Sequence, residues 1–462
     1  MLPAVSGPEP VEPQRFGSEV AARLAGQGRL LHLCHGPDGG LLAVGQVGDE
    51  LFAVNCTGRE GIDRPSAHGV EAARWEEERL GALGVTWAPP ADQQPAVRGR
   101  GVFTMPMGPV HGDAAESVGW HLDVMGDEIL AARLHFGWKR RGVAVALSAQ
   151  DPVAGVRVAE CVTGTSPVAH QLAYCQAWEA ALGLPVPAPA EHWRGVFAET
   201  ERVASHLGDL ANLSAACGLP VAAQELQMLR DMVLSAAQDL TGHRYLRGAV
   251  RLGGVEVEPP ARAALALATR LAAVGRRLWA VVGALAGTGT FLDRLVGTGR
   301  VDRAVASRLT PVGPVGRACG LSYDVRVHHP YGPYVDGAPA AAHRPEGDAW
   351  ARYSVRVDEL RASLEWLGRR LEGGPLSLAP APTPSRRATD GTVVAGRAEG
   401  PRGEVLYLVS RPAGPGSAWV RLRGASAVNW PVVPGAVANG NMLQDVPIIE
   451  ASFGLSVASL DQ

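Results

Sequence analysis

Residues 160–179 read ECVTGTSPVAHQLAYCQAWE, and this stretch decides the fold. From Pro167 onward the apolar residues recur at helical spacing, and helical segments dominate as far as about Val296. Three long helices are predicted inside that range: one begins after Pro189, one carries Leu226 to Val233, and one runs from Pro260 to Leu285. The centre of the chain is therefore expected to be a bundle of long helices.

Shorter elements are predicted on both sides of this bundle. They comprise strands at Leu41–Val47 and Glu50–Val54, a charged helix at Ala72–Leu83, strands between 100 and 135 with a turn near Gly126, a helix at Tyr353–Leu371 with Arg on its outer face, and a hairpin of Glu404–Val409 with Trp419–Leu422. Pro-rich stretches at Pro89–Pro95 and Pro375–Arg387 are expected to be linkers. The predicted class is α+β and α-rich, with a small α+β domain over residues 1–95 and a second domain over 100–462.

Composition narrows the class of protein. The 462 residues are 46% hydrophobic and 19% charged, which is typical of a globular chain. The 43 Lys and Arg against 46 Asp and Glu give a formal net charge of −3, which argues against a nucleic-acid partner. The longest apolar stretch, Leu278–Ala286, is about half of the roughly 20 residues that a membrane span needs. The N-terminus shows no signal-peptide core, so a cytoplasmic location is expected.

Residues that could take part in catalysis or bind a metal are scattered along the chain. No two of the six Cys form a CxxC pair, so they predict neither a zinc nor an iron–sulfur site and are expected to be small buried residues. Glu199, Arg202 and His206 stand at helical spacing, which by itself indicates a solvated or salt-bridged helix face. The adjacent His328 and His329 would point in opposite directions on a strand, so a metal is not expected there.

The order of many short motifs adds a resemblance to a known family. The motifs are Met107–His111 with Glu116, Gly137–Gly142, Glu160–His170, Ala173–Glu179, Glu199–Leu207, Arg230-Asp231, Gly242–Arg244, Gly253–Val255, Gly313-Pro314 with Arg317, Asp324 with Arg326, Pro330-Tyr331, Pro401–Glu404 and Asp445. From about residue 105 to the end, the chain resembles the 49-kDa subunit of respiratory complex I and the large subunit of group 4 nickel–iron hydrogenases. The resemblance implies a hydrogenase-large-subunit-like bundle of long helices with flanking β-hairpins.

The N-terminal domain carries a fainter resemblance of the same kind. Ala72-Ala73-Arg74-Trp75 with Glu77 looks like a motif of the complex I 30-kDa subunit, in a shortened and degenerate form. A 30-kDa-like part followed by a 49-kDa-like part is the arrangement of the large subunit in formate hydrogenlyase-type hydrogenases. Residues 1–95 are therefore expected to be a degenerate 30-kDa-like domain.

The resemblance also shows what this chain lacks. The four thiolates that hold nickel and iron in the hydrogenases correspond to Thr163, Ser166, Ser456 and Ser459. A hydroxyl stays protonated near neutral pH and is a poor ligand for soft metals that prefer sulfur. The chain is therefore expected to bind no metal and to activate no hydrogen.

Complex I subunits share that loss, and by resemblance the emptied cavity would serve a quinone-type acceptor. His111 and Glu116 are the implied catalytic residues, with His111 as proton source, although a buried His that holds a strand turn is the alternative. Arg141 would face an iron–sulfur cluster in a partner subunit and raise its electron affinity, with His170 behind it. The loop from Gly112 to Glu116 departs from the complex I pattern, so a different electron carrier, or none, stays an alternative.

Two functions follow from the resemblance. The first is an oxidoreductase subunit of the NADH–quinone or hydrogenase type, acting only within a complex. That complex would contain a small iron–sulfur subunit and antiporter-like membrane subunits, and would lie on the cytoplasmic face of the inner (plasma) membrane. This chain itself would bind no cofactor apart from the quinone-type acceptor. The alternative is a non-catalytic scaffold that couples to the antiporter-like partners.

Overall fold

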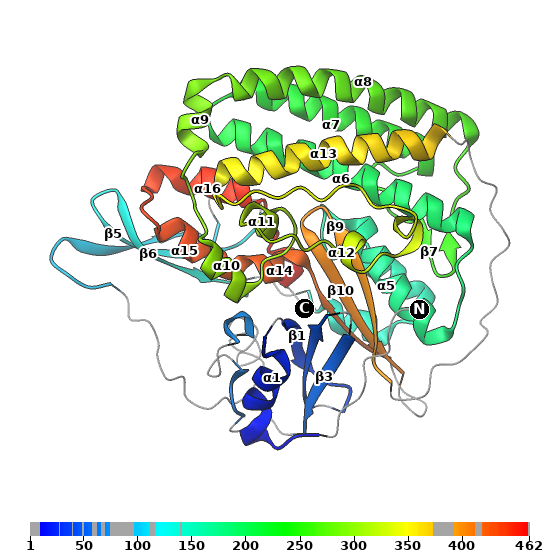
Figure 1. Cartoon of the computed structure of the whole chain (residues 1–462), viewed down its shortest axis with the longest axis horizontal. Coiled ribbons are helices and arrows are strands. Elements are labelled where there is room, and N and C mark those ends of the chain that lie inside the picture. Colours follow the sequence, from blue (N-terminus) through cyan, green and yellow to red (C-terminus); the bar gives the residue numbers. More distant parts are fainter. Residues whose placement is uncertain are drawn as a thin grey trace.

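The computed structural model describes residues 10–26, 28–38, 40–48, 50–57, 62–65, 70–73, 97–110, 116–138, 141–372, 392–411 and 418–460. Within these ranges no helix is both long enough and apolar enough to cross a bilayer. Long helices form one layer, and small antiparallel sheets lie beneath it and at one side (Figure 1). The α-rich α+β class is thereby confirmed.

Four long helices form the helical layer: α6 (Ala188–Ala216), α7 (Pro220–Thr241), α8 (Ala261–Ala286) and α13 (Ala349–Glu372). Helix α6 is buried on nearly all sides because α7, α13 and the C-terminal α16 (Val446–Phe453) all pack against it. Helix α8 buries one stripe and leaves the other in solvent, as its amphipathic pattern predicts. The three long helices predicted between Pro167 and Val296 are confirmed.

A three-stranded sheet lies under the bundle, with the order β11-β10-β9. It consists of β9 (Val394–Gly400), β10 (Gly403–Ser410) and β11 (Trp419–Arg423), and helix α5 (Pro167–Leu182) packs on β9 and β10. At Gly396 a Cβ atom would lie 2.1 Å from the carbonyl oxygen of Ala173, so only glycine permits this close approach of helix and strand. The predicted hairpin is confirmed as β10–β11, whereas the sequence did not predict β9.

The N-terminal unit contains α1 (Phe16–Leu24) and a sheet of β1 (Arg29–His35), β2 (Leu41–Val47) and β3 (Glu50–Cys56). Both predicted strands are confirmed. One face of this sheet contacts α1, and side chains of the other face, such as Leu31 and Val44, pack with Leu406 and Leu408 of β10. The division at 95–100 stays a prediction, since residues 74–96 lie outside the described ranges.

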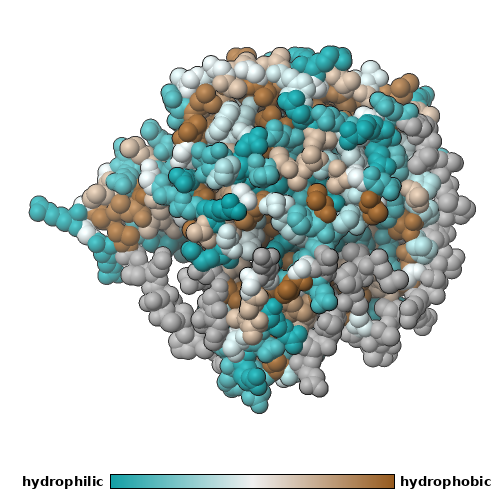
Figure 2. Space-filling model, in the orientation of Figure 1, coloured by the Kyte–Doolittle hydropathy of each residue, from teal (hydrophilic) through white to brown (hydrophobic). Residues whose placement is uncertain are grey.

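A second small sheet projects from the side of the molecule (Figure 1). It comprises β4 (Val102–Met107), β5 (Gly119–Met125) and β6 (Glu128–His135), and its base contacts α15 (Val433–Ala438). The turn predicted near Gly126 is confirmed, with Gly126 at a φ of 63° that suits glycine. Figure 2 shows hydrophobic surface near the base of this sheet and a hydrophilic tip.

Shorter helices connect these parts. They are α3 (Val143–Ala149), α4 (Pro152–Ala159), α9 (Gly289–Leu295), α10 (Arg303–Leu309), α11 (Gly313–Ala318), α12 (Val325–His328) and α14 (Ala425–Asn429). A two-residue strand pair, β7 (Val250–Arg251) and β8 (Gly254–Val255), follows α7.

The prediction that the helix Tyr353–Leu371 carries Arg on its outer face is confirmed for the exposed Arg361 and Arg369 but not for Arg356, and other predictions cannot be compared. Arg356 of α13 points inward and is 2% exposed, so the Arg residues of this helix are not confined to an outer face. It donates to the carboxylate of Asp209 at 3.3 Å and to the carbonyl of Ser452 at 2.8 Å. Beyond Ala73, the predicted helix Ala72–Leu83 lies outside the described residues, as do both predicted linkers.

Candidate functional site

The four positions that the resemblance matches to metal ligands of the hydrogenases, called the former ligand positions below, meet at one small cavity. Thr163 and Ser166 come from the segment before α5, while Ser456 and Ser459 come from the C-terminal segment after α16. The hydroxyls of Thr163 and Ser166 lie 2.7 Å apart in a hydrogen bond, and Ser459 donates to the carbonyl of Ser456 at 3.3 Å. The centre of a water-sized sphere can occupy about 10 Å³ of this cavity, which is room for about one water molecule.

The chemistry of these side chains does not suit a nickel–iron centre. All four positions carry neutral hydroxyls, two of which already bond to each other. The described residues include no group of three or more His, Cys, Asp or Glu that could hold a metal ion. No step through such a centre is therefore assigned to this chain.

Glu116 contacts Ser456, one of the residues that line the cavity. Its carboxylate accepts hydrogen bonds from the hydroxyl of Ser456 at 3.0 Å, from the backbone N–H of Ala458 at 3.0 Å and from that of Val457. The structure thus brings Glu116 against one of the lost ligand positions and fixes the last turn of the chain there. His111, the other predicted catalytic residue, lies outside the described residues.

Arg141 joins the first and last segments of the site. Its guanidinium donates to the backbone carbonyls of Cys161 at 3.2 Å, Val162 at 2.9 Å and Ala458 at 2.6 Å. Arg141 is exposed, so it presents positive charge at the surface beside the cavity. Cys161 is exposed as well, contrary to the expectation that every Cys is buried.

His170 lies at the inner wall of the cavity. It is buried on α5, and its Nδ1 is 3.0 Å from the hydroxyl of Tyr407. Burial, aided by the positive charge of Arg141, lowers the pKa of His170 to about 3. The imidazole is therefore neutral near pH 7. At that pH His170 cannot donate a proton as an imidazolium cation.

Arg402 is a cavity residue to which the sequence assigned no role. It lies in the turn between β9 and β10 and donates to the hydroxyl of Ser205 at 3.1 Å, to the carboxylate of Asp209 at 2.9 Å and to the carbonyl of Gly454. The sequence did contain a signal for Arg402, because it belongs to the motif Pro401–Glu404 that resembles the family. The resemblance assigned no function to this Arg.

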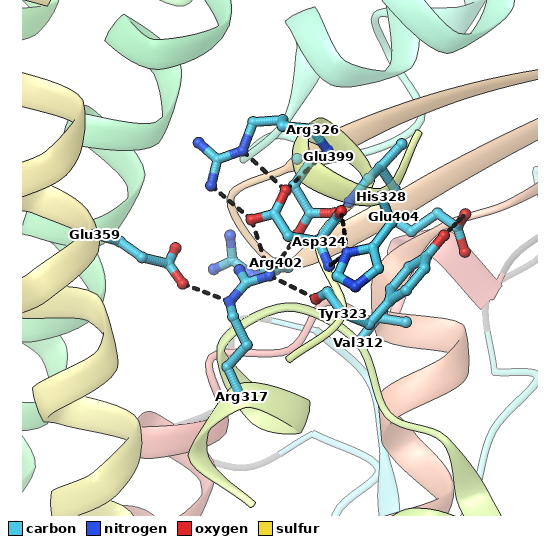
Figure 3. A network of polar contacts seen from close by, with 12 residues as sticks. Val312, Arg317, Tyr323, Asp324, Arg326, His328, Glu359, Glu399, Arg402 and Glu404 are labelled. Carbon is cyan, nitrogen blue, oxygen red and sulfur yellow. Dashed lines mark hydrogen bonds and ion pairs between the residues drawn. The ribbon is translucent and has the colours of Figure 1, made fainter. Parts of the chain in front are cut away.

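A buried network of ion pairs holds that turn in place (Figure 3). Arg317 of α11 donates to the carboxylates of Glu359 at 2.8 Å, Glu399 at 3.0 Å and Asp324 at 3.3 Å. Burial alone would raise the pKa of Glu359, but the charges of Arg317 and His206 outweigh it and hold that pKa below its usual range. Burial beside Asp324 raises the pKa of Glu399 to about 7.

The predicted helix-face residues of α6 belong to the same network. Arg202 donates to the carboxylate of Glu199 at 3.2 Å, and its other nitrogens reach the carbonyls of Glu399 at 2.6 Å and Gly400 at 3.0 Å. His206 contacts the carboxylate of Glu359 at 2.9 Å. The salt-bridged alternative is thus confirmed and the solvated one is wrong. Through Arg202, the network fixes the end of β9 that carries the turn with Arg402.

His328 and His329 do not form a shared site. The Nδ1 of His328 lies 3.0 Å from the backbone carbonyl oxygen of Asp324, and the Nε2 of His329 contacts the side-chain amide of Gln46. Their side chains therefore have different partners.

Glu201 supports the segment that carries Ser166, and its carboxyl should make the stability of the protein depend on pH. Its carboxyl accepts from the backbone N–H groups of Val168 at 2.6 Å and Ala169 at 3.1 Å, at the start of α5. Burial raises the pKa of Glu201 to about 8. Because the folded pKa exceeds the unfolded one, this group's contribution to stability is complete below about pH 4.5 and is lost as pH rises toward 8.

We expect Glu201→Gln to flatten the fall in stability between pH 5 and 8.5, because the variant has no proton to lose. Urea midpoints measured across this range in wild type and variant test it, with exposed Glu365→Gln of α13 as the matched control. The control should keep the wild-type slope. An unchanged slope in Glu201→Gln would show that this carboxyl is already ionised at pH 5.

Comparisons with known proteins agree with the motifs. Residues 223–378 match the family described as the respiratory-chain NADH dehydrogenase 49 Kd subunit. The carbon monoxide-induced hydrogenase of Rhodospirillum rubrum is 26% identical over 76% of this chain and 97% of its own length. NADH-quinone oxidoreductase subunit 4 of Thermus thermophilus is 27% identical over 78% of this chain and 94% of its own length.

Formate hydrogenlyase subunit 5 of Escherichia coli is 29% identical over 76% of this chain, which spans 61% of that relative. The fold is similar to a chain of the membrane-bound sulfane sulfur reductase, an archaeal respiratory membrane complex, with a TM-score of 0.72 and 24% identity over 81% of this chain and all of that one. The resemblance is confirmed: this chain is similar to complex I 49-kDa subunits and to hydrogenase large subunits.

Proposed function

We propose that this chain, as a relative of those two groups, is a subunit of a membrane-associated oxidoreductase of the complex I-like or hydrogenase-like type. In it, the chain shapes an electron-acceptor site beside an iron–sulfur cluster of a partner subunit and holds no nickel–iron centre. One observation carries the proposal. All four former ligand positions still line one cavity, and Glu116 is hydrogen-bonded to one of them, Ser456, although none of the four can supply a thiolate.

The size of the cavity bears on where an acceptor would bind. Room for about one water molecule is far too little for the ring of a quinone-type acceptor. The acceptor would therefore bind at the outer side of the cavity, near Glu116 and Arg141, and His111 is the proposed proton donor there. His170 is buried and neutral, so its proposed role is to orient neighbouring groups.

A partner surface is proposed around Arg141. Trp138 and Val145, which flank it in the sequence, are 59% and 71% exposed, and large exposed apolar side chains often mark contacts with another protein. This surface would receive the small iron–sulfur subunit. Antiporter-like membrane subunits would complete the assembly on the cytoplasmic face of the inner membrane. The similar fold of a chain from an archaeal respiratory membrane complex supports the membrane association alone.

The cluster potential in the purified complex tests this proposal. Arg141→Gln removes a positive charge beside the cluster, so we expect its midpoint potential to fall by on the order of 50 mV, with slower quinone reduction. Arg141→Lys keeps the charge and should stay near the wild-type potential. Exposed Arg262→Gln on α8 is a control for a distant lost charge. Redox titration followed by electron paramagnetic resonance gives the potential.

The same experiment separates the redox role from the scaffold alternative. A purified complex that shows no cluster signal would favour the non-catalytic scaffold. An intact cluster whose potential and quinone reduction are unchanged in Arg141→Gln would contradict the placement of the acceptor site beside Arg141.

A further inference from the structure

A second, larger cavity adjoins the one at the former ligand positions. It lies between α6, α7 and the segments 164–167 and 244–246, and the centre of a water-sized sphere can occupy about 90 Å³ of it. Thr165 and Arg402 line both cavities. At its outer end, Tyr245 is 40% exposed, so this cavity reaches the surface.

Positive charge exceeds negative charge around this second cavity. Arg230, Arg244 and Arg402 line it, and Arg244 is neutralised by an ion pair with Asp231. The single negative charge of Asp209 is shared by two cations, because both Arg402 and the buried Arg356 donate hydrogen bonds to it. Among the described residues Arg230 has no carboxylate partner, and its guanidinium donates only to the amide oxygen of Gln227, at a long 3.4 Å.

The other acidic residue of the cavity does not remove this excess. Glu201 has a pKa raised to about 8 by burial, so its carboxyl is neutral at pH 7. This carboxyl already accepts hydrogen bonds from two backbone N–H groups of α5. Among the lining arginines, Arg230 therefore has no compensating carboxylate, and Arg402 shares that of Asp209 with Arg356.

Two residues that line this cavity, Arg230 and Thr165, carry unused donors. The Nε of Arg230 and the hydroxyl of Thr165 are buried and find no hydrogen-bond partner within the described part of the chain. Gly208 makes room for the guanidinium, since a Cβ there would lie 3.2 Å from that Nε. A buried donor left unpaired costs about 1–3 kcal/mol, so a ligand that accepts hydrogen bonds from both groups would be stabilised.

We propose that this second cavity binds a small oxyanion, of the carboxylate or phosphate class, through Arg230 and Arg402 with the hydroxyl of Thr165 as a further donor. The planar fork of an arginine matches two oxygens of such an anion. The volume admits a single carboxylate or phosphate group. The exposed end at Tyr245 provides the entrance, and Arg402 places the bound anion next to the cavity at the former ligand positions.

Anion titration of the full chain tests this site. Calorimetry at pH 7 and constant ionic strength compares sodium phosphate and sodium acetate with sodium chloride. We expect saturable binding of phosphate, acetate or both to wild type, and which of them binds tells the two classes apart. Arg230→Gln should weaken that binding at least tenfold, because it removes a charge-assisted hydrogen bond. Arg262→Gln, an exposed arginine on α8, should bind as wild type does.

A folding control keeps the result interpretable. Arg230 is only partly buried, so its Gln variant should melt close to wild type in chloride, and Arg230→Lys should recover part of the affinity because it restores the charge. The inference is overturned if neither anion binds more than chloride does. It is equally overturned if a folded Arg230→Gln variant binds with wild-type affinity.

Discussion

Replacing Arg317 with Leu is expected to lower the melting temperature by about 5 °C or more, corresponding to about 3–5 kcal/mol of stability. Arg317 is fully buried and is the shared cation of Glu359, Glu399 and Asp324. Its loss leaves the buried carboxylates of Glu359 and Glu399 without the arginine that contacts them most closely, and a buried uncompensated charge costs far more than a lost surface ion pair.

Thermal unfolding followed by circular dichroism measures this effect. The matched control is Arg276→Leu on α8, an exposed arginine for which we expect a change of about 1 °C or less. Acid should reduce the difference in melting temperature between Arg317→Leu and wild type. Since the folded pKa of Glu359 is depressed, its stabilising contribution is present above about pH 4.5 and is lost as pH falls through the folded pKa. A variant that melts with wild type at pH 7 would contradict the role given to this network.

The elements that the sequence predicted well are those whose apolar pattern is local. Helix α8 shows a clear buried stripe at helical spacing, so its bounds came out within a residue or two. Strand β9 was missed because its sequence, VAGRAEG, has two glycines and two charged residues and little alternation. All seven residues are buried, and the strand is held by pairing with β10 and by ion pairs of Arg397 and Glu399. The partner strand and Glu404 follow closely in the sequence, but Arg317, the partner of Glu399, lies 82 positions earlier, and none of these contacts leaves a periodic apolar signal in β9.

The residues of the candidate site also differ in whether a local sequence pattern could predict them. Thr163, Ser166, Ser456 and Ser459 could be placed because motifs surround them, and the structure brings all four together. The role of Arg402 was missed because its partners Ser205 and Asp209 lie more than 190 positions earlier in the sequence. The inward Arg356 was missed for the same reason, since its partners belong to other helices. The role of His111 stays a prediction.

Replacing Glu404 with Leu is expected to destabilise the protein by about 3–5 kcal/mol and to loosen the N-terminal unit. Glu404 is fully buried on β10, where its carboxylate accepts from Arg397 at 2.9 Å, from Arg423 at 2.7 Å and from Arg29. Arg29 belongs to β1 of the N-terminal unit and stacks on Tyr323 with its guanidinium carbon 4.1 Å from the ring centre. One carboxylate thus compensates three cations, two of them buried and one partly buried, across the junction of two sheets.

Hydrogen exchange of the backbone amides distinguishes undocking from general loss of stability. In Glu404→Leu we expect faster exchange in β1–β3 than in α6 and α7, because three uncompensated arginines repel one another at the junction while the bundle keeps its own core. Glu404→Gln should act in the same direction, since it removes the charge and keeps the size. Arg29→Met should act more weakly because two cations still face the carboxylate, and exposed Glu365→Leu should change nothing. Equal acceleration in all helices and strands would show that Glu404 supports the whole fold and not the docking of its N-terminal unit.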